Sequence, residues 1–190
     1  MNLTQNKSST QSEKALFLDR DGVIVDYVPY LSEPSQVKIP QNAGKALRKW
    51  QDAGYLLIVI TNQSGVGRGY FSMDMVNLIH SHIREEYSFF GVKFKEFLVC
   101  PHHPSVRCAC RKPSPKMLFQ AAQKYNIDIV QSFFVGDASS DIECATSAGC
   151  SPVLLLTGRG VSTSKMLCNN RKKQVSIFES LSETVELIKN

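Results

Sequence analysis

Short apolar runs alternate with stretches of helical periodicity along most of this chain of 190 residues. Apolar runs bounded by polar or glycine residues are typical of buried strands. A repeated strand–helix–strand order favours right-handed crossovers. We therefore predict an α/β protein with a Rossmann-like parallel sheet and helices on both faces. The predicted strands are Ala15–Leu18, Tyr55–Thr61, Glu96–Cys100, Ser132–Gly136, Pro152–Thr157 and Val175–Phe178.

The segments between these strands carry helical spacing. Residues 42–53 place apolar side chains on one face, and Gly54 suits the position just past a helix end. Ser72 can cap a longer helix that continues to Tyr87. Further helices are predicted from Ser114-Pro115 to Tyr125, from Asp141 to Ala148 and from Ser180 to Lys189.

Length and composition are those of a globular domain, with 43% hydrophobic and 21% charged residues. We predict a single domain over residues 14–190, preceded by a polar, disordered tail over residues 1–13. The tail lacks the apolar segment of a secretory signal, and no apolar run approaches the roughly 20 residues that span a bilayer. We therefore expect a cytoplasmic protein with no membrane partner.

The net charge of +5 is spread along the chain. The one local excess of basic residues, at positions 171–173, is expected to be a solvated surface turn. A nucleic-acid-binding face would need a longer basic stripe with interleaved aromatic side chains. We therefore expect no nucleic-acid partner, and we expect the chain to act as a monomer.

Two carboxylates lie one residue apart in the segment Asp-Arg-Asp-Gly at residues 19–22, directly after the first predicted strand. Like charges this close raise each other's pKa unless a cation lies between them, and a divalent metal is the simplest such cation. A metal-bound carboxylate can act as a nucleophile while its neighbour moves protons. A calcium loop would need acids at alternate positions, but Val23, Val25 and Tyr27 follow instead.

Three further polar segments follow strands or precede a helix: residues 61–65 (Thr-Asn-Gln-Ser-Gly), residues 111–113 (Arg-Lys-Pro) and residues 136–141, which hold Asp137 and Asp141. Ligands of parallel sheets bind beyond the carboxyl ends of the strands, so these segments should meet at one edge. Hydroxyl and backbone N–H groups suit phosphate oxygens, and the acids fit a magnesium site of oxygen ligands.

Three of the six cysteines, Cys100, Cys108 and Cys110, crowd together beside His102 and His103. In a reducing compartment such clustering indicates a metal rather than disulfides, although unligated buried cysteines are the alternative. Three thiolates and one imidazole form a closed tetrahedral zinc site of the structural type. The remaining cysteines are expected to be small apolar residues: Cys144, Cys150 and Cys168.

Taken in order, the four polar segments resemble the four motifs of the haloacid dehalogenase-like phosphohydrolases, from about Ala15 to about Thr157. The resemblance implies a magnesium-dependent phosphoric monoester hydrolase. It implies that Asp19 attacks phosphorus to form an aspartyl-phosphate, and that Asp21 protonates the leaving alcohol and then activates water.

The same resemblance assigns the remaining catalytic groups. Thr61 and the backbone of Asn62 would hold the transferring phosphoryl group, and Lys112 would neutralise its charge and orient Asp19. Asp137 would complete a magnesium site with the Asp19 carboxylate and the Asp21 backbone carbonyl. Asp141 would steady Lys112 or a metal-bound water.

The cysteine-rich loop at residues 100–110 resembles that of small family members that act on heptose bisphosphate or histidinol phosphate. Their loop reads Cys-X-His and then Cys-X-Cys, which implies that His102, rather than His103, joins the three cysteines as a zinc ligand. The resemblance implies that there is no large cap domain. The zinc loop would take its place and fix Arg111 over the substrate. His103 is expected at the surface or facing substrate. No role is expected for the other histidines, His80 and His82.

Of these two substrates we favour the heptose bisphosphate, because Arg68 follows the second motif and, with Arg111, would bind a second phosphate. The expected reaction is removal of the 7-phosphate of D-glycero-D-manno-heptose 1,7-bisphosphate. The resemblance implies that this reaction supplies nucleotide-heptose for lipopolysaccharide. Histidinol phosphate is the alternative, favoured by the short spacing from His102 to Cys108. A polynucleotide 3′-phosphatase and a non-enzymatic zinc module are further alternatives. The residues expected to bind substrate are Tyr27, Tyr30, Thr61, Asn62, Gln63, Ser64, Arg68, Arg111 and Lys112.

Two segments depart from the pattern of the heptose enzymes. Ala138 stands where they usually have a lysine, so one cation is missing beside the phosphate. Tyr27 and Pro29 lie where the family contacts the sugar and are not the residues expected there, so sugar preference is expected to differ.

Overall fold

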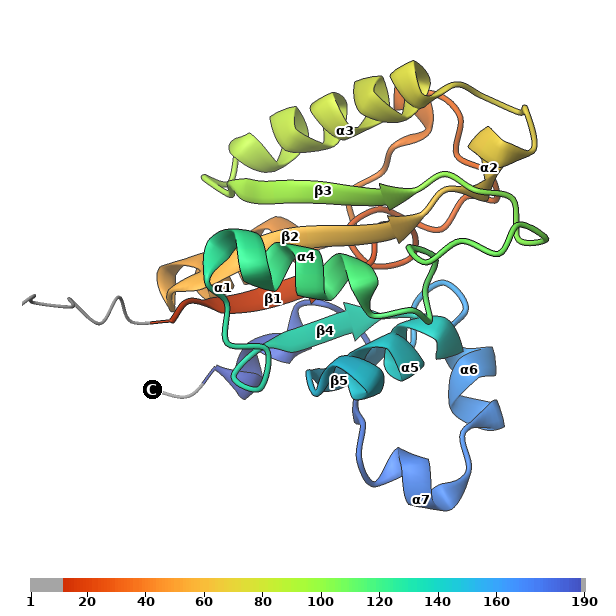
Figure 1. Ribbon diagram of the computed structural model, residues 1–190. Coiled ribbons are helices and arrows are strands. Elements are labelled where there is room, and N and C mark those ends of the chain that lie inside the picture. The colour runs from red at the N-terminus through yellow and green to blue at the C-terminus, as the bar shows by residue number, and fades with distance from the viewer. Residues whose placement is uncertain (1–11, 189–190) are drawn as a thin grey trace, which may run out of the picture.

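The computed structural model describes residues 12–188, which fold around a six-stranded parallel sheet with strand order β3-β2-β1-β4-β5-β6 (Figure 1). Every observed strand end lies within two residues of its predicted position, which confirms the predicted sheet. The strands are β1 (Lys14–Leu18), β2 (Tyr55–Asn62), β3 (Phe94–Cys100), β4 (Phe133–Gly136), β5 (Ser151–Leu155) and β6 (Ser176–Phe178).

Helices cover both faces of the sheet, as predicted. The helices α1 (Ala43–Asp52) and α3 (Met73–Ser88) pack on one face, and α4 (Lys116–Tyr125) and α5 (Ser139–Ala148) pack on the other. The predicted cap of α3 is present, because the backbone N–H of Met75 donates to the Ser72 hydroxyl at 3.1 Å.

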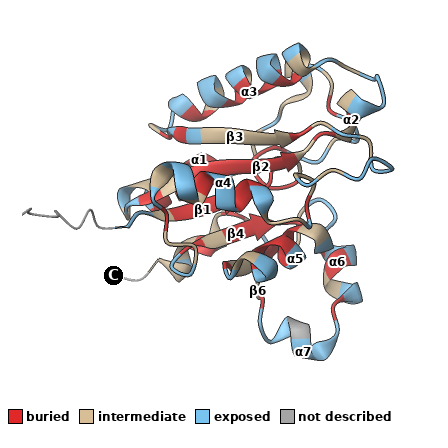
Figure 2. Ribbon diagram, viewed as in Figure 1, coloured by how far each residue is buried: buried red, intermediate tan, exposed pale blue. Residues whose placement is uncertain are grey.

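The central strand shows why the sequence gives this layered core. In β1, Leu16 and Leu18 pack with α1 and α3 on one side, whereas Ala15 and Phe17 pack with α4 and α5 on the other. Successive strand side chains point to opposite faces, so a strand buried on both sides must be apolar throughout. Figure 2 shows β1 and β2 as buried over almost their whole length.

Two predicted helices begin at other residues. α4 starts at Lys116, after Pro115 rather than at it, and the Ser114 hydroxyl accepts only a long 3.4 Å bond from the Lys116 backbone. α5 starts at Ser139 instead of Asp141, because the Asp141 carboxylate accepts the Ala138 backbone N–H at 3.0 Å and so caps the helix from its third residue.

The prediction of a C-terminal helix from Ser180 to Lys189 is wrong over residues 180–188, the part that the structure describes. The chain forms only a 3₁₀ turn there, Glu183–Leu187, whose Thr184 accepts a 3.0 Å hydrogen bond from the Trp50 indole. Short helices also went unpredicted, because one or two turns are too short to show a period. They are α2 (Ser64–Gly67), α6 (Gly160–Met166), α7 (Asn169–Lys172) and the 3₁₀ turn Pro34–Gln36.

Other predictions concern the start of the chain and its surface. Most of the predicted tail lies outside the described residues, but Glu13 already forms a bridge with Ile127. Lys172 and Lys173 are exposed as predicted, although a short helix replaces the predicted turn. Within residues 12–188, no helix is long and apolar enough to cross a membrane. Cys144 and Cys150 are buried as predicted, but Cys168 is exposed, so its prediction was wrong.

Candidate active site

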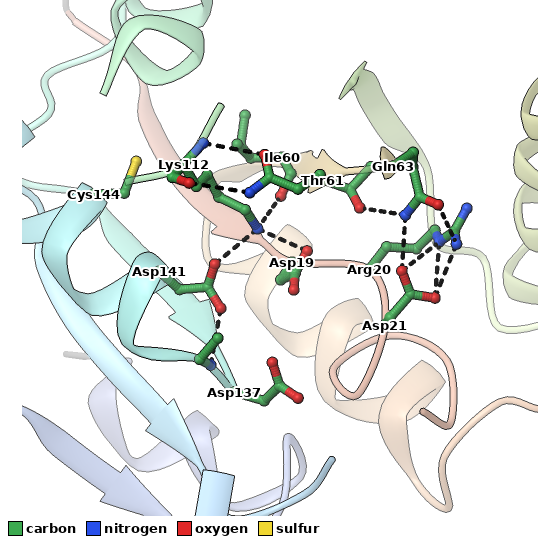
Figure 3. Close-up of polar contacts among 12 residues, drawn as sticks. Asp19, Arg20, Asp21, Ile60, Thr61, Gln63, Lys112, Asp137, Asp141 and Cys144 are labelled. Atoms are coloured by element: carbon green, nitrogen blue, oxygen red, sulfur yellow. Dashed lines mark hydrogen bonds and ion pairs between the residues drawn. The ribbon is translucent and has the colours of Figure 1, made fainter. Parts of the chain in front are cut away.

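Three neighbouring strands deliver acidic and hydroxyl side chains to one edge of the sheet (Figure 3). Asp19 directly follows β1, Thr61 lies near the end of β2, and Asp137 directly follows β4. The backbone N–H of Asp19 still donates to the Val135 carbonyl at 2.9 Å, so the regular sheet holds this residue in place. The predicted meeting of the polar segments at one edge is therefore observed.

Lys112 is the buried cation of this edge. Its ammonium nitrogen lies 2.8 Å from carboxylate oxygens of both Asp19 and Asp141 and donates to the Ile60 carbonyl at 2.7 Å. Burial opposes the charge of Lys112, but Asp141 and Asp19 outweigh it and raise the pKa of the lysine. Burial also raises the pKa of Asp141, to about 6, against the opposing effect of Lys112. Lys112 is thus a fixed positive charge shared between two acids.

Asp137 is completely buried and is held by the loop after β5. One of its oxygens accepts the Arg159 backbone N–H at 2.7 Å, and the other accepts the Arg159 guanidinium at 3.3 Å. Burial and then the charge of Asp19 raise the pKa of Asp137, against the effect of Arg159. Gly22 and Gly158 both have positive φ, and a Cβ on either would collide with an Asp137 oxygen, so this cradle requires glycine.

Asp19, Asp137 and Asp141 each offer a carboxylate oxygen, and these oxygens lie within 4.8 Å of one another. Such a cluster of buried oxygens fits the ligand preference of Mg²⁺. The magnesium ligands expected from the sequence were Asp19, Asp137 and the backbone carbonyl of Asp21. The side chain of Asp21 is turned to other partners, whereas Asp141 joins the acids while also touching Lys112, as expected.

The carboxylate of Asp21 is held by two side chains. The Arg20 guanidinium donates to it at 2.9 and 3.2 Å, and the Gln63 amide donates to it at 2.8 Å. The same amide donates to the Thr61 hydroxyl at 2.8 Å, and its carbonyl accepts from Arg20 at 2.9 Å. Arg20 was given no role from the sequence, although its place between two acids was a signal.

A cavity of about 370 Å³ opens over these residues. Most of the expected substrate-binding residues line it; Thr61, which is buried, is not among the lining residues. Arg159 also lines the cavity and was missed; an arginine between two glycines just beyond a strand end was the available signal. The expected residues that line the cavity are Tyr27, Tyr30, Asn62, Gln63, Ser64, Arg68, Arg111 and Lys112.

Two of these lining residues differ in what they can offer an anion. Nη1 of Arg111 is buried and has no hydrogen-bond partner among the described residues. The Asn62 side chain is instead engaged twice with the backbone of Lys112, at 3.1 and 3.2 Å. This pair ties the end of β2 to Lys112, so Asn62 has only its backbone to offer a ligand.

The aromatic side chains near the cavity mouth lie beside arginines. Tyr30 packs edge-on against Tyr70 at 4.9 Å between ring centroids, and the Arg68 guanidinium lies 5.9 Å from the Tyr30 ring. On another side, the Arg159 guanidinium lies 5.5 Å from the Tyr27 ring. Ala138, which stands where related enzymes have a lysine, is buried. The cation beside Asp137 is Arg159.

The predicted zinc ligands gather just beyond β3. The sulfurs of Cys100, Cys108 and Cys110 and the Nδ1 atom of His102 all lie within 4.8 Å of one another. Individual separations are 3.6 Å for Cys100–Cys108 and 3.2 Å for Cys110–His102, which suits four ligands around one tetrahedral Zn²⁺. His103 is exposed and contacts Ser105 at 2.6 Å, so it stays outside this cluster, as expected.

Comparisons with known proteins agree on one family. A family profile described as HAD-hydrolase-like matches residues 109–184. The D-glycero-beta-D-manno-heptose-1,7-bisphosphate 7-phosphatase of Pseudomonas aeruginosa is 40% identical over 80% of this chain and 86% of its own length. The D-glycero-alpha-D-manno-heptose-1,7-bisphosphate 7-phosphatase of Photorhabdus laumondii is 41% identical over the same shares.

A solved structure is similar over nearly the whole chain. The D,D-heptose 1,7-bisphosphate phosphatase of B. bronchiseptica, complexed with magnesium and phosphate, superposes with a TM-score of 0.85 at 31% identity. The match covers 92% of this chain and 97% of that one. The likeness therefore extends over nearly all of the fold.

Proposed function

The chain belongs to the haloacid dehalogenase-like hydrolases, in the group of D-glycero-D-manno-heptose-1,7-bisphosphate 7-phosphatases, and from that premise we propose that it removes the 7-phosphate of D-glycero-D-manno-heptose 1,7-bisphosphate. The observation that carries the proposal is the contact of buried Lys112 with Asp19 in a cavity lined by four arginines. The product, a heptose 1-phosphate, would feed nucleotide-heptose supply for lipopolysaccharide.

In the proposed first step, a carboxylate oxygen of Asp19 attacks phosphorus and the bond from phosphorus to the sugar oxygen breaks. Asp21 gives its proton to that leaving oxygen, and Lys112 offsets the charge on the phosphoryl oxygens. In the second step, Asp21 takes a proton from water, and the water oxygen attacks phosphorus. This releases inorganic phosphate and restores the Asp19 carboxylate.

The residues proposed to hold Mg²⁺ are the carboxylates of Asp19 and Asp137 and the backbone carbonyl of Asp21, with Asp141 close by. When bound, the ion would supply positive charge to the phosphoryl oxygens and align the phosphorus with Asp19. The described side chains support this assignment, because three buried carboxylates share only two cations, Lys112 and the half-exposed Arg159, which leaves a surplus of negative charge.

We propose that Arg68 and Arg111 bind the second phosphate and that Tyr27 and Tyr30 contact the sugar between the two phosphates. The unpartnered Nη1 of Arg111 supports this role, since a buried donor without an acceptor is costly until an anion arrives. This arrangement favours a bisphosphate over histidinol phosphate, which has one phosphate and a positive amine.

We also propose that Cys100, His102, Cys108 and Cys110 bind a structural Zn²⁺. Four protein ligands leave no open position for water, so the site would not be catalytic. Its effect would be mechanical, because Arg111 directly follows a ligand and Lys112 follows Arg111. The loop thereby connects the zinc site to two residues of the cavity.

A substrate panel tests the proposal. Purified protein is assayed for phosphate release from heptose 1,7-bisphosphate, histidinol phosphate and a 3′-phosphorylated oligonucleotide, with Mg²⁺ and with a chelator. We expect the heptose bisphosphate to be turned over fastest, only with Mg²⁺, and to lose the phosphate at C7. Faster turnover of histidinol phosphate would contradict the substrate assignment, and no turnover of any ester would contradict the phosphatase assignment.

A further inference from the structure

The amide of Gln63, a residue that lines the cavity, is the centre of a buried hydrogen-bond network (Figure 3). Its nitrogen donates to both Asp21 and Thr61 at 2.8 Å, and its oxygen accepts from Arg20 at 2.9 Å. A primary amide has two N–H donors and one carbonyl, so each of its polar groups has a partner here. Its side chain is therefore committed to protein groups.

The network allows only one orientation of this amide. Turning it over would set its oxygen against the Asp21 carboxylate and its nitrogen against the Arg20 guanidinium, and both contacts would be repulsive. The backbone of Gln63 is fixed as well, because its N–H donates to the Cys100 carbonyl at the end of β3 at 2.8 Å. The amide thus sits on the rigid edge of the sheet.

Arg20 is equally constrained. It is almost fully buried, and its guanidinium approaches Nε2 of His80 at 3.5 Å, on the side away from Asp21. Burial, with the charges of Arg20 and Arg84, lowers the pKa of His80 to about 3, so this ring stays neutral beside the guanidinium. Arg20 and Gln63 therefore form a stiff support for the Asp21 carboxylate.

We propose that Gln63 is a positioning residue that aligns the Asp21 carboxylate with the Thr61 hydroxyl, and so sets the geometry of proton transfer to the leaving group. This inference rests on the proposed function, in which Asp21 is the proton donor. Arg20 alone would pull the carboxylate toward itself, whereas Gln63 draws one of its oxygens toward β2 without adding charge.

Gln63 orients Thr61 in the same way. The Thr61 oxygen accepts the amide N–H, which leaves the hydroxyl hydrogen for another acceptor. In the proposed reaction that acceptor is a phosphoryl oxygen. One side chain would thus fix two groups that act on opposite ends of the breaking bond, Thr61 on the phosphoryl group and Asp21 on the leaving oxygen.

The test uses the leaving group as its readout. A sugar alcohol leaves poorly without a proton, whereas p-nitrophenolate leaves well without one. A residue that positions the proton donor should therefore matter more for the sugar phosphate than for p-nitrophenyl phosphate. Loss of fold stability, in contrast, would lower both rates by the same factor.

We would compare kcat for heptose 1,7-bisphosphate and p-nitrophenyl phosphate in the wild type, Gln63→Leu and Gln51→Leu. Gln51 is the matched control, because its amide also bridges two backbone groups, at 2.7 and 3.1 Å, but lies away from the cavity. We expect the kcat of Gln63→Leu to fall about 100-fold for the sugar phosphate, which lies within the usual range for proton transfer, but only about tenfold for the aryl phosphate. Gln51→Leu should leave the ratio of the two rates unchanged.

An equal loss on both substrates in Gln63→Leu would overturn the inference. If that variant does not fold, Gln63→Glu keeps the side-chain length, replaces the amide donors by a carboxyl group and sets an acid against Asp21. It must shift the ratio in the same direction or the inference fails. Wild-type turnover tests the proposed function separately. If the wild type is active but the ratio of the two rates does not change in the Gln63 variants, only the role of Gln63 is refuted. An inactive wild type would refute both that role and the proposed function.

Discussion

The ammonium nitrogen of Lys112 lies 2.8 Å from Oδ1 of Asp19, and both side chains are almost entirely shielded from solvent. This contact holds the Asp19 carboxylate in one orientation. Because Lys112 also contacts Asp141, one positive charge serves two acids. Function and stability therefore depend on the same lysine.

Replacing Lys112 by methionine should destabilise the fold and abolish turnover. The substitution leaves two buried carboxylates without their cation, which costs about 3–5 kcal/mol when one partner of a buried pair is removed. Urea unfolding in a chelator measures this loss, and added Mg²⁺ should recover part of it by replacing the missing charge.

The control for this substitution is Lys124→Met. Lys124 pairs with Glu96 at 2.7 Å, but its side chain is mostly exposed, so its loss should change stability little. Equal stability of the Lys112 and Lys124 variants would contradict the role given to the buried pair.

The proposed zinc loop should couple stability to substrate binding. Cys110→Ser removes one of four ligands, so the purified variant should lose the expected content of about one zinc ion per chain and unfold at a lower temperature. The KM for heptose bisphosphate should rise, because Arg111 follows Cys110 directly. Metal analysis, thermal unfolding and steady-state kinetics measure the three effects.

Cys168→Ser provides the comparison for the zinc loop, since Cys168 is exposed and lies outside the cluster. It should keep the zinc content, unfolding temperature and KM of the wild type. A Cys110→Ser protein with full zinc content would show that the cluster is not the site of the ion.

The part of the site that could be read from the sequence lies at strand ends. Asp19, Thr61 and Asp137 each follow an apolar run, and the order of strands and helices requires a parallel sheet that brings such ends together. The proposed zinc ligands were also accessible, because all four lie within 11 consecutive residues, 100–110, although the choice of His102 over His103 came from the resemblance to the family loop.

The supporting contacts were not accessible from the sequence. Arg20 meets Gln63 and His80 across separations of 43 and 60 residues, and no local pattern encodes such a meeting. Arg159 reaches Asp137 from a loop with no periodicity. The predicted helix after Ser180 failed because a spacing of apolar residues over so short a segment does not distinguish an α-helix from a 3₁₀ turn.

Arg159→Ala should bind Mg²⁺ more tightly than the wild type. The guanidinium shares an Asp137 oxygen, so its removal takes a positive charge away from the acids and frees a lone pair. Because the side chain is about half exposed, screening limits the gain to roughly two- to tenfold in affinity. Calorimetric titration with Mg²⁺ alone measures it.

Arg48→Ala is the control for Arg159→Ala, because it removes the same charge from a side chain of similar exposure. The Arg48 side chain, which pairs with Asp52 on the surface, is 48% exposed, and that of Arg159 is 50% exposed. It should leave the affinity for Mg²⁺ unchanged. Weaker binding of Mg²⁺ in Arg159→Ala would mean that the guanidinium supports the site instead of competing with the ion.

His80 should make the fold sensitive to mild acid. Its pKa is lowered from 6.5 to about 3, chiefly by burial and further by Arg20 and Arg84, so the folded state resists a proton that the unfolded chain accepts. The stabilising effect of neutral His80 is complete above pH 6.5 and is lost as the pH falls toward about 3. The slope is at most about 1.4 kcal/mol per pH unit.

Urea unfolding of the metal-free protein across this range, compared with His80→Gln, isolates the contribution. The variant should lose less stability on acidification than the wild type. His82→Gln is the control, because His82 lies partly exposed on the same helix near Glu85. Parallel slopes for the wild type and His80→Gln would argue against a neutral His80 in the fold.

The central claim is that Asp19 carries the phosphoryl group in the course of turnover. Heptose 1,7-bisphosphate labelled with ³²P at the 7-phosphate, mixed with enzyme and Mg²⁺ and quenched in acid within one turnover, tests this claim directly. We predict label on the peptide that contains Asp19, and none in Asp19→Asn. Phosphate release at the wild-type rate with no label on that peptide, or full turnover by Asp19→Asn, would contradict the account.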